Sequence, residues 1–222
     1  RPLHIAISVG EVSKLKFNDY FVQEGLAFRF TPFNYRVWGD AEGDNGYAVD
    51  IEKLYDNVMN RYKYGGLDTP GLYLDETTLR TCYYHRRLFA QLAKELIKQG
   101  DHVRARKVLT YAEQAVPAYN VPEIYESGSF DIATAYAALG EKTKAVTLFN
   151  HLIAESEDYI NWAFSLGNGR TGMMQNDCLY KFWQWNAYNE RMKEIDKESY
   201  EASNRRFEEK YALFTQIINN RN

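Results

Sequence analysis

The sequence contains few of the residues that build disulfides or metal centres. Its 222 residues include two cysteines and four histidines. Cys82 and Cys178 stand far apart and form no Cys-x-x-Cys pair, so two reduced, buried thiols are expected rather than a disulfide. The histidines show neither His-x-x-x-His nor His-Glu-x-x-His spacing; they are His4, His85, His102 and His151. We therefore expect neither a metal nor any other cofactor.

Long apolar runs and an excess of one charge are missing as well. No run of about 18 apolar residues occurs, so no segment is expected to cross a bilayer. The 27 Lys and Arg against 30 Asp and Glu give a net charge of -3. Without a basic stripe, this balance argues against a nucleic-acid partner. The first residue is Arg1 and no signal-like segment follows, so we expect the chain to be part of a longer protein.

Apolar and aromatic residues are plentiful. Hydrophobic residues make up 45% of the chain and aromatic residues 15%. At this length the chain can hold one large domain, or a small domain with a helical repeat attached. The aromatic content favours a core packed with large side chains and a surface able to bind a partner.

Two stretches, residues 89–117 and 129–157, match each other position by position. The matches pair Gly100 with Gly140, Ala105 with Ala145, and Leu109 with Phe149. The order of bulky, small and turn residues is that of a tetratricopeptide repeat, in which two helices pack along a line of small side chains. Each glycine is expected to end the first helix of its pair in a left-handed conformation. The sequence thus predicts a mainly α fold, a tetratricopeptide-like α-α superhelix.

The N-terminal residues have a different pattern. Apolar residues alternate with smaller or polar ones over residues 3–9 and again over residues 26–30, which predicts two strands. An amphipathic segment at residues 15–23 predicts a short helix between them. Two strands are too few to be stable alone, so we expect the sheet to be completed by sequence before Arg1 or by another chain. This is the small N-terminal α/β element.

A loop-rich connector follows, with a short helix expected at residues 50–62. Residues 72–74 (Leu-Tyr-Leu) are expected to pack back on the body. Asp75 is expected to cap a long helix running to about Gln99. We therefore place the domain boundary between residues 74 and 75. Residues 1–74 form the α/β element and connector, and residues 75–222 form the helical domain.

The end of the chain is expected to cap the helical repeat. Residues 159–172 read as an irregular aromatic crossing. Residues 173–189 and 190–218 read as two helices that form a third, degenerate pair.

Candidates for chemistry have simpler structural explanations. Asp75 and Glu76 could act as an acid and base pair, but their position at a helix start favours capping. The glycines of residues 167–172 lack the Lys-Ser/Thr of a phosphate loop. Residues 39–46 have the oxygen density of a calcium loop without its ligand order, which favours an exposed turn. We expect no catalytic residue.

The groove of the repeats is the remaining candidate site. Arg87, Lys94, Phe130 and Thr134 fall at concave positions, where basic side chains could anchor an acidic group of a peptide. Trp183 and Trp185 should point in different directions on a helix. Trp185 is the one we place at the surface, where it could stack on a sugar or fill a protein pocket, although helix packing is the favoured role for the pair. An open alternative is that the two repeats only support a larger fold.

Three segments carry a resemblance to a known family. They are RPLHIAISV at residues 1–9, YFVQEGLAFR at residues 20–29 and GGLDTPGLYLDE at residues 65–76. In this order they resemble the C-terminal soluble part of a family of large bacterial multi-spanning membrane proteins of unknown function. That family is similar to the transmembrane protein O-mannosyltransferases, which also end in tetratricopeptide repeats. The resemblance runs from Arg1 to about Trp162, and residues 65–76 are its most specific part.

The resemblance implies a non-catalytic tail on the periplasmic face of the inner membrane. It implies contact with the membrane portion of the parent glycosyltransferase-like protein through the incomplete sheet, and presentation of the groove to protein partners or acceptor segments. The alternatives are a stand-alone periplasmic carbohydrate- or peptide-binding protein and, third, a hydrolase. Exposed Leu3, Ile5 and Phe28 would favour the tail, a closed sheet would favour the stand-alone binder, and converging carboxylates in a deep pocket would favour the enzyme.

Overall fold

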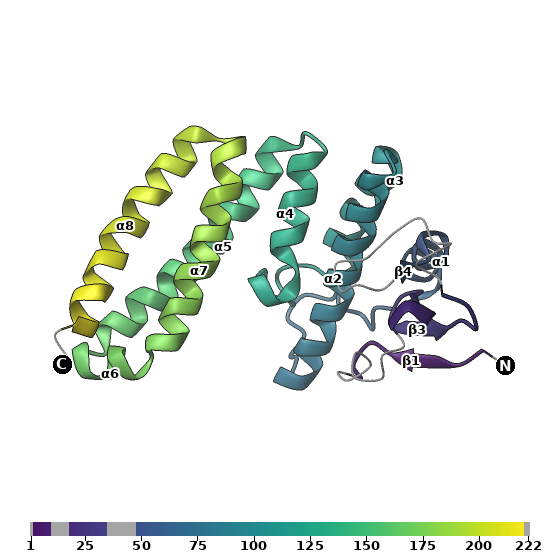
Figure 1. Cartoon of the computed structure of the whole chain (residues 1–222), viewed down its shortest axis with the longest axis horizontal. Helices are drawn as coiled ribbons and strands as arrows, with labels where there is room; N and C mark the ends of the chain where they lie inside the picture. Colours follow the sequence, from purple (N-terminus) through teal and green to yellow (C-terminus); the bar gives the residue numbers. More distant parts are fainter. Residues whose placement is uncertain (1, 10–17, 35–47, 220–222) are drawn as a thin grey trace. The chain divides into compact units, whose positions relative to one another are not determined.

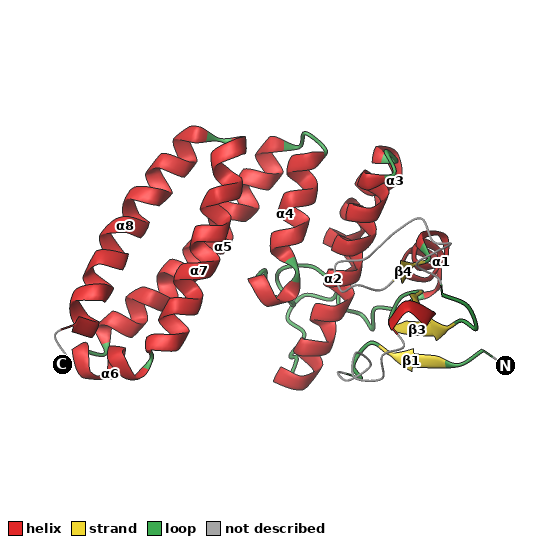
Figure 2. Ribbon diagram, in the orientation of Figure 1, coloured by secondary structure: helices red, strands yellow, loops and turns green. Residues whose placement is uncertain are grey.

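The computed structural model describes residues 2–9, 18–34 and 48–219, and these are mainly helical (Figures 1 and 2). They form helices α1 to α8 and a small N-terminal sheet, which confirms the prediction of a mainly α chain with a small N-terminal α/β element. The chain divides into two compact units, Arg1–Pro122 (unit 1) and Glu123–Asn222 (unit 2). The division falls in the proline-bearing connector between the two matching stretches.

The sheet of unit 1 has four short strands in the described residues. They are β1 (His4–Ala6), β2 (Phe21–Gln23), β3 (Ala27–Phe30) and β4 (Ala48–Val49). Their order is β1-β3-β2-β4, with β4 parallel to β2 and the other pairs antiparallel. Phe21 and Phe28 are buried, with Ile5, Ile7 and Phe30 packed against them.

The strands β1 and β3 confirm the two predicted strands, but two related expectations are wrong. Residues 21–23, assigned to a helix, form β2, and the sheet is completed by β2 and β4 of this same chain. All of β2 is buried because it lies between β3 and β4, so it lacks the alternation that identifies a half-exposed strand. Residues 15–17 of the expected helix lie outside the described residues.

The expected short helix is confirmed. Helix α1 (Ile51–Asp56) is capped by the side chain of Asp50, which accepts a hydrogen bond from the backbone N–H of Lys53 at 3.1 Å. It continues as one π-helical turn over Asn57–Arg61. The cap satisfies one of the backbone donors that every helix start leaves open.

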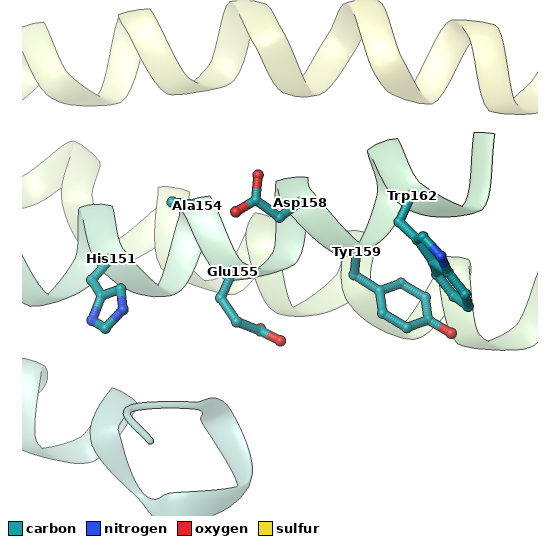
Figure 3. A pocket seen from close by; sticks show the side chains of 6 residues that line it. All are labelled: His151, Ala154, Glu155, Asp158, Tyr159 and Trp162. Atoms are coloured by element: carbon teal, nitrogen blue, oxygen red, sulfur yellow. The ribbon is translucent and has the colours of Figure 1, made fainter. Parts of the chain in front are cut away.

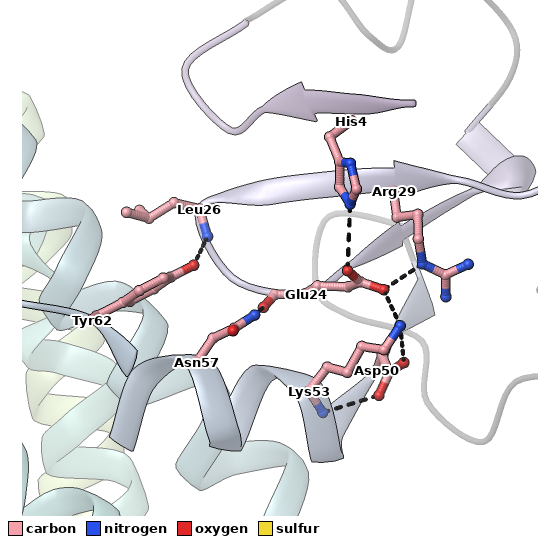
Figure 4. Close-up of polar contacts among 8 residues, drawn as sticks. All are labelled: His4, Glu24, Leu26, Arg29, Asp50, Lys53, Asn57 and Tyr62. Atoms are coloured by element: carbon pink, nitrogen blue, oxygen red, sulfur yellow. Dashed lines mark hydrogen bonds and ion pairs between the residues drawn. The ribbon is translucent and has the colours of Figure 1, made fainter. Parts of the chain in front are cut away.

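The turn between β2 and β3 is fastened to α1 by Glu24 (Figure 4). The Glu24 carboxylate accepts a hydrogen bond from Lys53 Nζ at 2.8 Å and another from Arg29, and it lies 3.6 Å from His4 Nε2. Asn57 Nδ2 donates to the Glu24 carbonyl oxygen at 2.7 Å. A carboxylate engaged in this way is a structural anchor, because its oxygens are occupied by the groups that hold the turn.

Gly25 allows a close approach in the same turn. Its φ of +143° disfavours other residues, and a Cβ atom at this position would lie 2.1 Å from Tyr62 Oη. That hydroxyl accepts a hydrogen bond from the backbone N–H of Leu26 at 2.9 Å (Figure 4). The tight turn therefore depends on glycine.

Substitution of Glu24 gives a pH-dependent prediction. Burial raises the pKa of Glu24, but the hydrogen bonds from Lys53 and Arg29 outweigh burial, and the net effect lowers the pKa from 4.5. A lowered carboxyl pKa stabilises the fold above the unfolded pKa, and this contribution is lost as pH falls through the folded value. We expect Glu24→Gln to reduce the free energy of unfolding by about 1–2 kcal/mol at pH 7. Urea unfolding should show the difference shrinking below about pH 4.5. A constant difference down to pH 3 would contradict this explanation.

The first matching stretch forms a helical hairpin in unit 1. Helix α2 (Glu76–Lys98) packs against α3 (His102–Ala115), and Gly100 between them has a φ of +78°. Asp75 caps α2 by accepting hydrogen bonds from the backbone N–H groups of Thr77 and Thr78, as predicted. Ala93 and Ala105 are fully buried where the expected line of small residues lies.

Arg86 on α2 is buried, although its sequence neighbours suggest a polar surface. Its guanidinium donates hydrogen bonds to the carbonyl oxygens of Val116 at 2.9 Å, Val121 at 2.5 Å and Pro122 at 2.6 Å. These bonds fasten the connector that follows α3 to the middle of α2.

The segment before α2 is held differently from the prediction. Leu72 and Tyr73 are exposed, Tyr73 to 88%, so the expected packing of residues 72–74 is wrong for these two side chains. Leu67 is the buried apolar residue of this loop. Asn120 Nδ2 donates to the carbonyl oxygens of Leu67 at 2.7 Å and Thr69 at 2.6 Å. Polar bonds to the backbone thus hold the loop where apolar packing was expected.

Unit 2 is built from helices in the described residues. They are α4 (Ser129–Ala138), α5 (Lys142–Ser165), α6 (Asn168–Met173), α7 (Gln175–Ile195) and α8 (Lys197–Asn219). Helices α4 and α5 form the hairpin predicted from the second stretch, and Gly140 between them has a φ of +77°. Helix α5 also packs against α7, and α7 packs against α8 (Figure 1).

Two boundaries in unit 2 differ from the prediction. Residues 159–165 continue α5 and do not form an irregular crossing. The two C-terminal helices are confirmed, but they meet at Asp196 and not after residue 189. No glycine or proline interrupts α7, and its buried stripe runs on to Met192.

Candidate interaction surface

The predicted groove residues are divided between the two units. Arg87 is exposed on α2 of unit 1, and its guanidinium lies 5.5 Å from the centre of the Tyr84 ring. Lys94 lies about two turns further along the same helix and is partly exposed. Phe130 and Thr134 lie one turn apart on α4 of unit 2, where Thr134 Oγ1 donates to the Phe130 carbonyl oxygen at 2.9 Å. The structure therefore brings Phe130 and Thr134 into contact on α4, while Arg87 and Lys94 lie about two turns apart on α2 of the other unit.

Phe130 links the core of unit 2 to its surface. The centre of its ring lies 6.0 Å from that of Phe149 and 5.8 Å from that of Tyr188, both of which are fully buried. The Tyr125 ring lies 5.7 Å from that of Phe130 and 6.3 Å from that of Tyr188. Phe130 is itself half-buried, so it supports this surface more than it projects from it.

The assignment of Trp185 to the surface is wrong. Trp185 is fully buried, and its Nε1 donates to Ser203 Oγ on α8 at 2.8 Å. Ser203 Oγ in turn donates to Asn189 Oδ1 at 2.6 Å. The exposed member of the pair is Trp183, at 52%. The signal was present in the sequence, because Cys178, Phe182, Trp185, Asn189 and Met192 repeat at intervals of about 3.5 and form a stripe that excludes Trp183.

Three aromatic side chains form what we call the α7 aromatic surface: Tyr125, Tyr180 and Trp183. The rings of Tyr180 and Trp183 are stacked, with centres 5.8 Å apart and planes 11° apart. Tyr125 meets Trp183 edge-on at 5.3 Å and Tyr180 at 6.5 Å. Tyr180 is 44% exposed. Sequence reasoning missed Tyr125 and Tyr180, because Tyr125 joins them only in the folded chain.

Two carboxylates, Glu126 and Asp131, lie near the Tyr125 ring of this surface. Glu126 Oε1 accepts a hydrogen bond at 3.0 Å from the side-chain amide of Gln184, the residue that follows Trp183. Burial raises the pKa of Tyr125, and the nearby Asp131, Tyr180 and Glu126 raise it further.

A second candidate is an open hollow on α5 of about 450 Å³ (Figure 3). Its lining residues are His151, Ala154, Glu155, Asp158, Tyr159 and Trp162. Lys181 from α7 bonds both carboxylate oxygens of Glu155 at 2.9 Å, and His151 Nδ1 lies 2.8 Å from Glu123 Oε2. Most of the charge in the hollow is thus engaged by the chain itself.

The carboxylates of this hollow do not converge. In Figure 3 the side chains of Glu155 and Asp158 leave α5 in different directions. Glu155 is bound by Lys181, which leaves it poorly placed to act as a proton donor or acceptor for a ligand. The hollow therefore lacks the paired carboxylates expected of the hydrolase alternative.

His85 and the two cysteines are not among the residues that form either candidate surface. His85 lies between tyrosine rings, 5.2 Å from that of Tyr64, and burial lowers its pKa. It does not belong to the polar helix face that its neighbours suggest. Cys82 and Cys178 are buried free thiols, as predicted, and burial raises the pKa of both.

The described residues offer neither a metal site nor a membrane-spanning helix. The described part of the chain contains no cluster of three or more His, Cys, Asp or Glu side chains that could hold a metal ion. None of the described helices has the length and apolar character needed to span a bilayer. The calcium-loop-like residues 39–46 lie outside the described residues.

Comparison of the chain with protein-family models, with curated proteins and with solved structures found no match. Function must therefore be argued from the surfaces described above.

Proposed function

We propose that this chain is a non-catalytic interaction domain that binds a protein segment at the α7 aromatic surface. The observation that carries the proposal is the exposed, stacked pair Tyr180 and Trp183, backed by Tyr125. Exposed clusters of Tyr and Trp are typical of binding surfaces, because a large rigid ring gives much contact area for little loss of side-chain freedom.

The order of the helices supports a tetratricopeptide-like arrangement. Three hairpins follow one another along the chain, formed by α2 with α3, α4 with α5, and α7 with α8. In such repeats the first helix of each pair lines the binding face. Phe130 on α4 and Trp183 on α7 both belong to first helices, and Tyr125 lies just before α4.

The sequence resemblance supports a periplasmic location for this domain, as the tail of a membrane glycosyltransferase-like protein. Its partners would then be acceptor segments and the membrane portion of the parent protein. The exposure of the apolar residues of the sheet gives mixed support for a tail that docks through this sheet. Leu3 is 59% exposed, as a docked tail would need, but Phe28 is buried.

A stand-alone carbohydrate- or peptide-binding protein is the second candidate. The sheet favours it in part, since strands β2 and β4, which extend the two predicted strands to four, come from this chain. The flat face of the Tyr180 and Trp183 pair also suits stacking on a sugar ring.

Trp183→Ala tests the proposed surface in the full-length parent protein. Removal of a central aromatic contact costs about 2 kcal/mol of binding, so retention of partners in a pull-down should fall about 30-fold. Leu213→Ala is the control, since Leu213 on α8 is 46% exposed and belongs to neither candidate surface. It should leave partner retention unchanged.

The outcomes separate the two candidates. Loss of partners together with reduced transfer of sugar to acceptor proteins supports the tail. Loss of binding to an immobilised oligosaccharide, with partners retained, supports the stand-alone binder. Unchanged partners, sugar transfer and oligosaccharide binding in Trp183→Ala would reject the α7 aromatic surface as the site.

A further inference from the structure

We propose that a water molecule is bound inside unit 2, where it joins Ser156 of α5 to Gln184 and Tyr188 of α7. The inference concerns the core of the unit and does not depend on the proposed function. The water is a fixed part of the joint between the second and third helical hairpins.

Three buried polar atoms carry the proposal. Ser156, Gln184 and Tyr188 are fully buried. Even so, Ser156 Oγ, Gln184 Oε1 and Tyr188 Oη have no hydrogen-bond partner among the described residues. Unpaired buried polar atoms are costly, and proteins satisfy nearly all of them with their own groups or with ordered water. Three such atoms on two facing helices therefore indicate a shared ligand.

The two hydroxyl groups face each other between α5 and α7. Burial raises the pKa of Tyr188, and the carboxylates of Glu155 and Glu126 raise it further. The Ser156 hydroxyl opposes this rise, which places it close to the hydroxyl of Tyr188. The two groups still do not meet with the geometry of a hydrogen bond. Gln184 lies one turn before Tyr188 on the same face of α7, so its amide belongs to the same cluster.

The amide of Gln184 cannot satisfy its oxygen by rotating. Its Nε2 donates to Glu126 Oε1 at 3.0 Å. An ionised carboxylate accepts hydrogen bonds but cannot donate them, so the amide nitrogen must face Glu126 and the amide oxygen must face away from it. Gln184 Oε1 therefore needs a donor from another source.

A water molecule matches this set of atoms. It can donate to Gln184 Oε1, accept from the hydroxyl of Tyr188 and form a third bond with that of Ser156. About three hydrogen bonds are usual for a buried water. A metal ion would suit the amide oxygen but would leave both hydroxyl hydrogens without an acceptor. The chemistry of the three atoms thus favours water over a cation.

A fourth unpartnered atom of unit 2 belongs to a different place. Asn189 Nδ2 is also buried without a partner among the described residues. The Oδ1 atom of the same amide accepts from Ser203 on α8, so Asn189 is part of the contact between α7 and α8. It is not assigned to the water site.

A double variant tests whether the water is bound. Ser156→Ala with Tyr188→Phe removes both hydroxyl groups and keeps most of the volume of the two side chains. Magnetic relaxation dispersion of the water oxygen counts long-lived internal waters in the whole chain, and we expect the count to fall by one. Ser165→Ala is the control, because its exposed hydroxyl donates to the Trp162 carbonyl oxygen, and it should leave the count unchanged. Circular dichroism spectra that match the parent chain show that both variants are folded.

A crystal structure of the parent chain locates the water without any variant. We expect one density peak within about 3.2 Å of Ser156 Oγ, Gln184 Oε1 and Tyr188 Oη. A direct hydrogen bond between Ser156 and Tyr188 with no such peak overturns the proposal, as does an unchanged water count in the folded double variant. Contacts of about 2.4 Å, as in a calcium site, would identify a metal ion and would also overturn it.

Discussion

Arg86→Ala is expected to lower the free energy of unfolding of unit 1 by about 4 kcal/mol, the largest effect among the polar residues described. The guanidinium is buried and donates to the carbonyl oxygens of Val116, Val121 and Pro122. A hydrogen bond to a charged group contributes about 1.5–3 kcal/mol, and removal of the donor leaves buried carbonyl groups without their partner. Urea unfolding followed by circular dichroism measures the change.

Arg87→Ala is the matched control for this substitution. Arg87 is the next residue on α2, is exposed, and contacts the Tyr84 ring. Its removal should cost no more than about 0.5–1 kcal/mol. Arg86→Lys separates charge from shape, because lysine keeps the positive charge but lacks the planar fork of N–H donors with which the guanidinium reaches three carbonyl groups. Wild-type stability in Arg86→Lys would show that charge alone holds the connector.

Trp185→Ala is expected to lower the free energy of unfolding of unit 2 by about 3–5 kcal/mol. The indole fills space between α7 and α8, where the Phe207 ring meets it edge-on at 5.7 Å. Its loss leaves a cavity and also removes the donor to Ser203. Urea unfolding of the variant, again followed by circular dichroism, provides the measurement.

Two further tryptophan variants serve as controls for the destabilisation expected of Trp185→Ala. Trp183→Ala should cost less than about 1 kcal/mol, because half of that side chain is already in solvent. Trp185→Phe keeps much of the volume but lacks the N–H donor, so a cost of about 1–2 kcal/mol is expected. Equal costs for Trp183→Ala and Trp185→Ala would contradict the assignment of one to the surface and the other to the core.

The helical hairpins could be predicted because their signals are local. Gly100 and Gly140 adopt the left-handed conformation that ends a helix, and small residues such as Ala105 mark where a neighbouring helix approaches. Asp75 caps its helix through N–H groups only two and three residues away. Each of these features depends on a few neighbouring residues, so the sequence shows them directly.

The sheet and the buried arginine could not be predicted in the same way. Strand β4 has only two residues, Ala48–Val49, which is too short to show any alternation. It exists because β2 offers it a partner. Arg86 is buried because distant carbonyl groups in the connector receive its hydrogen bonds, and nothing within its own helix indicates them.

The three residues of the α7 aromatic surface were not among the predicted site residues. Phe130 was identified from its place in the repeat, and it does pack against Tyr125. The rings of Tyr125 and Trp183 come from segments more than 50 residues apart. Their contact depends on how α7 packs on α5 and α4, which periodicity within one helix does not reveal.

Two neighbouring residues of the connector, Pro122 and Glu123, are bound by different units. The Pro122 carbonyl oxygen is held by Arg86 of unit 1, and the side chain of the next residue, Glu123, is held by His151 of unit 2. A cut between residues 122 and 123 would leave each half with its own anchoring contacts, and this bond is the natural place at which to divide the protein into separately expressed pieces.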